Sequence, residues 1–158
     1  IYSIRDLIDI VGSDSIRFNF LNRTLDSQQE FDLDLAVKQS NENPVYYVQY
    51  AHARCCNIIK RYDGEIDIKN DSLLNQLTED AESLIIAKLI DFPDVIKKCV
   101  QTLEPQNISN YLNELASSFH SYYAKHKVID VNNKDLTSAR IYLSNCAKIV
   151  IKNGLNLQ

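Results

Sequence analysis

Apolar residues recur along most of the chain at steps of three and four, a spacing that places them on one face of an α-helix. Short polar stretches, several with Gly, Asn or Asp, separate the segments that show this pattern. No segment alternates convincingly between apolar and polar residues, and the one β-rich run, Val128–Val131, is too short to build a sheet. The predicted helices cover residues 4–11, 14–22, 31–39, 44–62, 78–90, 92–103, 105–127 and 136–153.

Residues at the ends of these segments support the helix boundaries. Ser3, followed three residues later by Asp6, resembles a capping box, and Asn43 before Pro44 is the strongest helix start in the chain. Pro93 is expected to begin a new helix, and Gly154 is expected to end the last one. These features predict an all-α fold, an antiparallel bundle of about seven or eight helices around a single core.

Composition is that of one globular domain or a compact piece of a larger protein. The chain has 158 residues, 45% of them hydrophobic, and no apolar run long enough to span a membrane. It contains no Met, so we expect it to be part of a longer protein, and it has no secretory signal, so we expect a cytoplasmic protein without a membrane partner.

Cysteine and histidine spacing gives no reason to expect a metal site. The four Cys residues lack the paired short spacings of a zinc site, and the three His residues are not placed at i, i+4 with a carboxylate partner. The cysteines are expected to be reduced and mostly buried. We therefore predict no metal and no cofactor bound by this chain.

Charge is distributed unevenly along the sequence. The net charge of −4 argues weakly against a polyanionic partner, but residues 63–104 alone hold ten acidic and four basic residues. Residues 105–158 hold six basic and three acidic ones. The acidic middle is expected to be a solvated face, whereas the flanking parts could supply a neutral to basic surface rich in Tyr.

No catalytic motif is present: the chain has no nucleophile with its base, no converging pair of carboxylates and no Gly-rich phosphate loop. The helix from Pro44 instead places Tyr47, Tyr50 and Arg54 on one face, and a second cluster contains Phe119, Tyr122 and Tyr123 beside basic residues. Tyr rings and Arg guanidinium planes are the groups on which unpaired RNA bases stack. The alternative is that these rings are buried in the core with only their hydroxyl groups in water.

One run of residues is distinctive: Gln39-Ser-Asn-Glu-Asn-Pro-Val-Tyr-Tyr-Val-Gln-Tyr-Ala-His-Ala-Arg54, which follows Phe31-Asp-Leu-Asp-Leu35. This run resembles the C-terminal part of arginyl-tRNA synthetases, which are class I aminoacyl-tRNA synthetases. Residues 11–18, 111–128, 139–143 and 151–155 resemble the same family.

The resemblance implies a DALR-type anticodon-binding bundle over residues 31–158, with residues 1–30 as helices that link it to a catalytic domain. In this family the catalytic domain binds ATP and attaches arginine to its tRNA through His-Ile-Gly-His and Lys-Met-Ser-Lys-Ser type motifs, and neither motif occurs here. The implied partners are the anticodon stem and loop of arginine tRNA and the catalytic domain of the same enzyme, with no DNA. This part alone is expected to be inactive.

The resemblance also implies which side chains contact RNA. Asn43 is expected to serve as a helix cap, and Asp32 or Asp34 to cap a helix or form a salt bridge, because anions repel phosphate. The other reading of the whole chain is a purely structural helical bundle that docks onto a catalytic domain or another protein. The residues predicted to bind RNA are Tyr46, Tyr47, Gln49, Tyr50, His52, Arg54, Tyr123, Lys127, Arg140 and Asn153.

Overall fold

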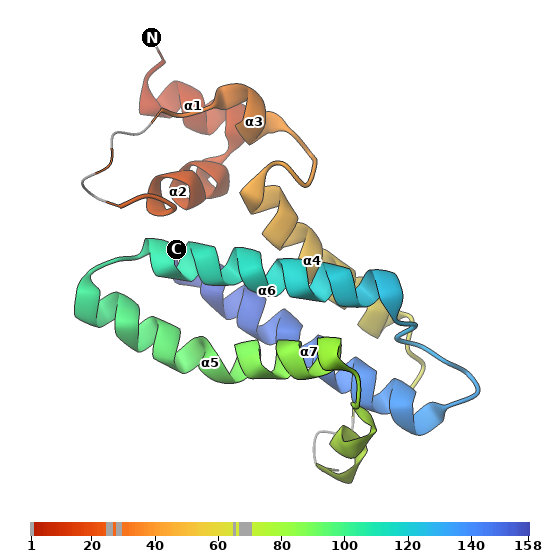
Figure 1. Cartoon of the computed structure of the whole chain (residues 1–158). Helices are drawn as coiled ribbons and strands as arrows, with labels where there is room; N and C mark the ends of the chain where they lie inside the picture. Colours follow the sequence, from red (N-terminus) through yellow and green to blue (C-terminus); the bar gives the residue numbers. More distant parts are fainter. Residues whose placement is uncertain (1, 25–26, 28–29, 65, 67–70) are drawn as a thin grey trace.

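The structure is a computed structural model that describes residues 2–24, 27, 30–64, 66 and 71–158. Within these residues all regular structure is helical and no strand forms, which confirms the predicted fold class (Figure 1). A short 3-10 helix, η1 (Asp71–Gln76), precedes α5. The α-helices are α1 (Ile4–Val11), α2 (Ser13–Leu21), α3 (Leu33–Val37), α4 (Pro44–Lys60), α5 (Asp80–Thr102), α6 (Gln106–Lys125) and α7 (Lys134–Asn156).

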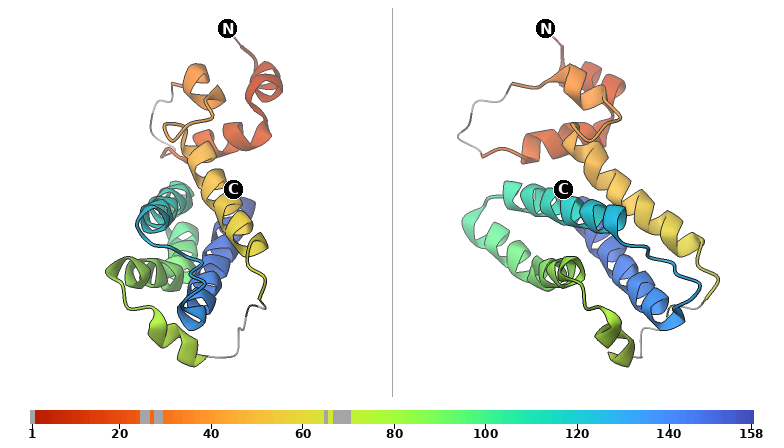
Figure 2. Two further views of the ribbon diagram at one scale, coloured as in Figure 1. Left: turned by 90° about the vertical axis from the view of Figure 1, so that its right-hand side faces the viewer. Right: turned by 45° about the vertical axis from the view of Figure 1, so that its right-hand side comes forward.

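Two groups of helices make up the molecule. The short helices α1, α2 and α3 lie together at one end, and α4 leads from them into a bundle with α5, α6 and α7 (Figures 1 and 2). Helix α6 packs on α5, and α4 packs on both α6 and α7. The predicted division of the chain after residue 30 stays a prediction. Helix α3, which follows this division, packs against α1, which precedes it.

Capping interactions fix the predicted helix starts. The Ser3 hydroxyl accepts a hydrogen bond from the Asp6 amide at 3.3 Å, and the Asp6 carboxylate accepts one from the Ser3 amide at 2.8 Å. Asn43 is buried, and its Oδ1 accepts from the Tyr46 amide at 3.5 Å, while its Nδ2 donates to the carbonyls of Ala36 and Lys38. Asn43 therefore starts α4 and also ties it to the preceding loop.

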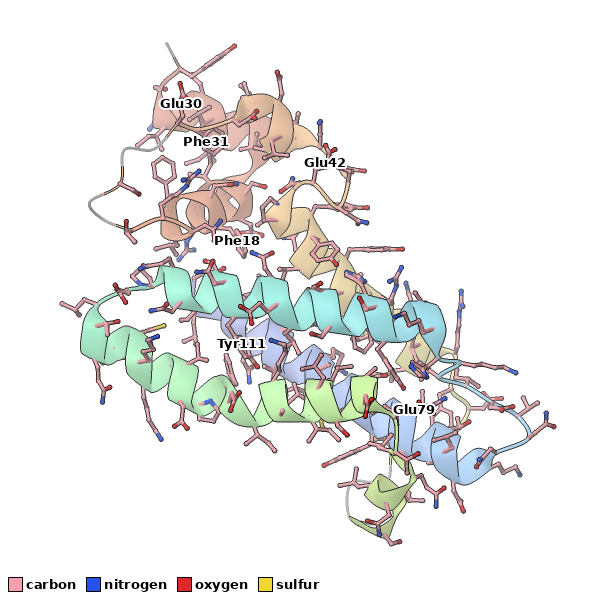
Figure 3. The ribbon with its side chains drawn as sticks, in the orientation of Figure 1. Phe18, Glu30, Phe31, Glu42, Glu79 and Tyr111 are labelled. Carbon is pink, nitrogen blue, oxygen red and sulfur yellow. The ribbon has the colours of Figure 1, made fainter. Side chains whose placement is uncertain are left out.

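The core lies where α4, α5, α6 and α7 face one another. Tyr111 of α6 points toward α5, where its ring stacks on Phe92 with centroids 5.4 Å apart (Figure 3). Phe18 of α2 is 2% exposed and joins the N-terminal helices to this core. Burial of each large apolar side chain stabilises the fold by about 1.5–3 kcal/mol. The largest fully buried side chains include Tyr122, Phe18, Phe119, Ile85, Leu112, Leu115, Ile141 and Ile151.

Three predicted boundaries are wrong. Pro93 does not start a helix but lies inside the continuous α5, where its side chain is exposed. Phe92, just before it, and Cys99, further along the same helix, are buried in the core. Packing of this apolar face outweighs the cost of a mid-helix proline, which is about 3 kcal/mol. The segment predicted as a helix over 31–39 is helical only from Leu33 to Val37, because Asp32 is its N-cap, and Val37 is exposed rather than buried.

Gly154 is the third case. Instead of ending α7 it lies buried within it, and a Cβ atom at this position would be 2.6 Å from Cδ2 of Leu112 in α6. The absence of a side chain lets α6 and α7 approach closely at this point. Gly154 therefore serves helix packing, although a glycine near the end of a helical segment also fits the pattern of a residue that ends the helix.

Candidate nucleic-acid interface

One face of α4 carries a row of aromatic and basic side chains at steps of four residues. Tyr46, Tyr50 and Arg54 follow one another along this face because four residues make just over one helical turn. The rings of Tyr46 and Tyr50 stack with centroids 5.9 Å apart and an interplanar angle of 9°. Both rings remain partly in solvent, and Tyr50 is 40% exposed.

Helix α6 completes this row from a distant part of the sequence. The His120 ring stacks on Tyr50 at 5.5 Å and contacts Tyr47 at 4.6 Å, measured between ring centroids. The sequence showed two separate aromatic clusters, and the packing of α4 on α6 brings their outward members together.

Arg54 lies at the centre of this arrangement. Its Cζ atom is 4.6 Å from the ring centroid of Tyr50 and 4.7 Å from that of Tyr123, distances at which a guanidinium is attracted by both rings. Its Nη2 donates to the Tyr50 hydroxyl at 3.0 Å, and its Nη1 lies 2.7 Å from Nδ1 of His120. Within the described residues Arg54 forms no salt bridge. We refer to these six side chains as the aromatic–arginine face: Tyr46, Tyr47, Tyr50, Arg54, His120 and Tyr123.

Two shallow hollows extend the face toward the C-terminal ends of α4 and α6. The first, about 180 Å³, is lined by Asn57 and Arg61 together with Tyr50, Arg54 and Tyr123. The second, about 290 Å³, shares Arg61 and Tyr123 and adds His126 and Lys127. The ammonium of Lys127 is exposed and lies 3.6 Å from Asp130, so the pair is loose and screened by solvent. Basic groups thus lie directly beside stacked rings.

Gln49 and His52 lie elsewhere, although they belong to the same helix. They line a separate cleft of about 350 Å³ between α2, α4 and the end of α7, next to Arg17 and Lys152. Burial, together with the charges of Lys148 and Lys152, lowers the pKa of His52. The structure does not bring these two residues to the aromatic–arginine face.

Arg140 and Asn153, from α7, are also outside the face. Arg140 is 7% exposed, and its Nε donates to Oε1 of the fully buried Glu82 at 2.7 Å. Its Nη1 donates to the backbone carbonyl of Lys127 at 2.9 Å, so it supports the loop that lines the second hollow. Asn153 is exposed near the C-terminal end of α7, where its carbonyl accepts from the Leu157 amide.

The aromatic residues differ in burial, and RNA contact by the exposed ones stays a prediction. Phe119 and Tyr122 are fully buried, and burial raises the pKa of the Tyr122 hydroxyl, whereas Tyr46, Tyr50 and Tyr123 reach the surface. His120 is the residue of the face that is missing from the predicted set. Its spacing of three residues from Tyr123 places the two on the same side of α6, and that signal was present in the sequence.

The cysteines are free, as predicted, and Cys55 and Cys99 are buried while the other two are partly buried. Burial raises the pKa of the Cys55 thiol to about 12, so this thiol is not a nucleophile near neutral pH. No group of three His, Cys, Asp or Glu side chains suited to a metal ion occurs in the described part of the chain. Among the same residues, no helix is both long enough and apolar enough to cross a membrane.

Exposed aromatic rings and Arg guanidinium groups are the side chains on which RNA-binding proteins stack unpaired bases. Residues 48–157 match the family described as DALR anticodon binding domain, so the chain belongs to this family. It is 46% identical over 158 residues to an arginine–tRNA ligase of Geotalea daltonii and 40% identical over 157 residues to arginine–tRNA ligase 1 of Halalkalibacterium halodurans. In both comparisons 98% of this chain is covered, but it spans only 28% of the relative's length.

Solved structures have the same fold. A Campylobacter jejuni protein solved as an arginyl-tRNA synthetase superposes with a TM-score of 0.86 and 28% identity, over 96% of this chain and 33% of that one. The arginyl-tRNA synthetase of Plasmodium falciparum gives a TM-score of 0.82 at 20% identity, over 98% of this chain and 27% of that one, and supports the fold alone. The resemblance inferred from the sequence and the all-helical fold are both confirmed.

Proposed function

We propose that this chain is the anticodon-binding part of an arginine–tRNA ligase and holds the anticodon stem and loop of arginine tRNA. The remainder of such an enzyme binds ATP and attaches arginine, and the 158 residues contribute binding and discrimination without chemistry. The family match and the relatives, of which this chain spans about a quarter of the length, support this proposal.

The observation that carries the proposal is the aromatic–arginine face. Tyr46 and Tyr50 offer stacked, partly exposed rings to unpaired bases, and Arg54 offers a cation that no described carboxylate neutralises. Arg61 and Lys127 line the adjoining hollows, where their charges can contact phosphates next to a stacked base. None of the described residues of the acidic stretch 63–104 lines either hollow.

The apolar surface of α1 suits the second partner proposed, the catalytic domain of the same enzyme. None of the eight residues of α1 is buried, and the apolar side chains of Ile4 and Ile8 are 62% and 40% exposed. An amphipathic helix that keeps several apolar side chains exposed, although it packs on α2 and α3, is suited to docking on another domain. This role in joining two domains accompanies RNA binding and does not compete with it.

The direct test is a titration of the protein against two labelled RNA stem-loops of equal length at two salt concentrations. One carries the anticodon loop of arginine tRNA, and the other has its anticodon bases changed. Preference for the cognate loop that weakens but survives at higher salt supports the proposal, because phosphate contacts are salt-dependent and base contacts are not shared between the two RNAs. Equal binding of both RNAs, or no binding, contradicts it.

A pair of substitutions separates the RNA-binding function from the purely structural bundle. Tyr47→Ala combined with Arg54→Ala should abolish preference for the cognate loop while the far-ultraviolet circular dichroism stays helical. Asn110→Ala is the control, since it changes an exposed residue of α6 that lies outside the face and lines neither hollow. Loss of helicity in the double variant, with RNA binding lost only in proportion, would favour the structural bundle.

A further inference from the structure

The two ring nitrogens of His120 face groups that fix its protonation state. Nδ1 lies 2.7 Å from Nη1 of Arg54, and Nε2 lies 3.2 Å from the backbone carbonyl of Tyr47. A guanidinium nitrogen can only donate and a carbonyl oxygen can only accept, so Nδ1 must carry the lone pair and Nε2 the proton. The neutral Nε2–H tautomer is the one form of the ring that satisfies both contacts.

We propose that neutral His120 is the positioning residue that holds Arg54 between Tyr50 and Tyr123 for RNA binding, and that protonation of His120 releases Arg54. The inference rests on the proposed function and adds a pH-sensitive control of the same face. It gives His120 a role in RNA binding that does not require it to touch the RNA.

The surroundings of the imidazole make its charged form unfavourable. On α4 it faces the Arg54 guanidinium, the Tyr47 carbonyl and the rings of Tyr47 and Tyr50, and no carboxylate forms a salt bridge with it in the described structure. Burial and the Arg54 charge lower the pKa of His120, and the Tyr47 carbonyl acts in the opposite direction. An imidazolium would set a second donor and a second positive charge against Arg54 at the distance of a short hydrogen bond.

Release of Arg54 affects the rest of the face, because the same guanidinium contacts three of its rings. Without the His120 acceptor, the contact with the Tyr50 hydroxyl and the two ring faces must hold the side chain alone. A flexible guanidinium loses rotamer freedom when RNA binds, a cost that a fixed one has already met during folding.

Protonation also adds a positive charge beside the RNA, so the charge and the release of Arg54 have opposite effects on affinity. If charge alone governed affinity, lowering the pH would strengthen RNA binding. Release of Arg54 predicts the opposite sign, a loss of about tenfold in affinity for the cognate stem-loop, the usual effect of losing one hydrogen bond to a charged group. The loss should follow the titration of His120 below its ordinary pKa of 6.5.

The binding experiment measures the affinity for the cognate stem-loop between pH 7.5 and 5.5 for the protein and three variants. His120→Gln keeps an acceptor for Arg54 and a donor for Tyr47 but cannot be protonated, so it should bind nearly as well as the parent at pH 7.5 and lose the pH dependence. His120→Lys places a permanent cation there and should bind about tenfold more weakly at every pH. His52→Gln removes the other histidine with a lowered pKa, which lies outside the face; whatever its effect on affinity at pH 7.5, it should retain the fall in affinity toward pH 5.5, and loss of that fall would assign the pH dependence to His52 and overturn the inference.

Nitrogen NMR of the free protein tests the contact between His120 and Arg54 without RNA. At pH 7.5 the His120 ring should show a protonated Nε2 and an unprotonated Nδ1, and the Arg54 side-chain signals should broaden as His120 titrates. An Nδ1–H tautomer or an imidazolium at pH 7.5 overturns the inference. So does a His120→Gln variant that keeps the pH dependence, in which case the proposed function stands. A correct tautomer with no stem-loop binding at any pH refutes the proposed function and, with it, the role of His120 in RNA binding.

Discussion

Arg54 and Arg140 are both held firmly by the fold, but by opposite kinds of partner. Arg140 is 7% exposed and paired with the fully buried carboxylate of Glu82, so its charge is neutralised inside the bundle. Arg54 is partly exposed and held by two rings, a hydroxyl and a neutral imidazole, none of which cancels its charge. The first arrangement organises the protein, and the second leaves a positive charge available at the surface.

The two arginines are nevertheless connected. Arg140 donates to the carbonyl of Lys127, and Lys127 lines the hollow next to Tyr123, which packs on Arg54. The interior pair therefore supports the loop at one end of the aromatic–arginine face. Both residues were predicted to bind RNA, and only the packing of the helices distinguishes the one that organises the fold from the one that faces solvent.

Arg140→Met should have the largest effect, because it leaves the Glu82 carboxylate buried without a positive charge beside it, with only the Glu79 amide still donating to its Oε2 at 3.0 Å. We expect a loss of about 3–5 kcal/mol in the free energy of unfolding, measured by urea denaturation. RNA binding should fall only as far as the protein unfolds.

The double variant Arg140→Met with Glu82→Leu provides the control. Removing both charges should restore most of the lost stability, since a well-packed apolar pair often replaces a buried ion pair without cost. A single variant that loses less than about 1 kcal/mol would show that Glu82 finds water or another partner, and the contrast with Arg54 would then fail.

Arg54→Met should reverse this pattern. Because the side chain is partly exposed and its partners stay satisfied by solvent, we expect the free energy of unfolding to change by less than about 1 kcal/mol. Affinity for the cognate stem-loop should fall about 30-fold, or about 2 kcal/mol, as for a central arginine of an interface. Fluorescence anisotropy and urea denaturation of the same sample check both parts, and a large loss of stability with unchanged affinity would contradict them.

Lowering the pH should weaken the fold through His52 and His120. Both have a folded-state pKa below the ordinary 6.5, so the unfolded chain takes up protons first as the pH falls. The free energy of unfolding should therefore be steady above pH 7 and decline between about pH 6.5 and 5.5, by less than in Arg140→Met. Urea denaturation across this range measures the decline, and the variant His52→Gln with His120→Gln should flatten it. A stability that rises on acidification would show that these rings gain rather than lose protons on folding.

Lys127→Ala should have the smallest effect. If Lys127 neutralises one phosphate, the slope of log affinity against log salt should fall by about 0.7, with little change in preference for the cognate loop. Lys38→Ala is the control, because Lys38 is paired with Glu42 at 2.7 Å and lies outside the hollows. Equal changes in the two slopes would argue against a local phosphate contact at Lys127.

Much of the fold could be predicted because its signals are local. Ser3 and Asn43 start helices through contacts within a few residues, and the apolar spacing of α6 defines its buried face. Pro93 and Gly154 misled for a non-local reason. Their positions within α5 and α7 depend on packing against other helices, including the contact between Gly154 and Leu112.

The site was predictable only in part, for a similar reason. Helical periodicity places Tyr50 and Arg54 together and turns Gln49 and His52 toward another side of α4, but it does not tell which of these sides faces α2 and α7. The contact of Arg54 with His120 joins residues 66 positions apart, and spacing within one helix cannot reveal it.

The fixed position of Arg54 also determines how binding should proceed in time. A side chain that already occupies its binding position needs no rearrangement after encounter, so the association rate of RNA should be set by diffusion and long-range attraction. Substitutions that loosen Arg54 without removing its charge, such as replacement of Tyr123, should leave that rate nearly unchanged. They should instead shorten the lifetime of the complex, so the contribution of the two rings that hold Arg54 is to residence time.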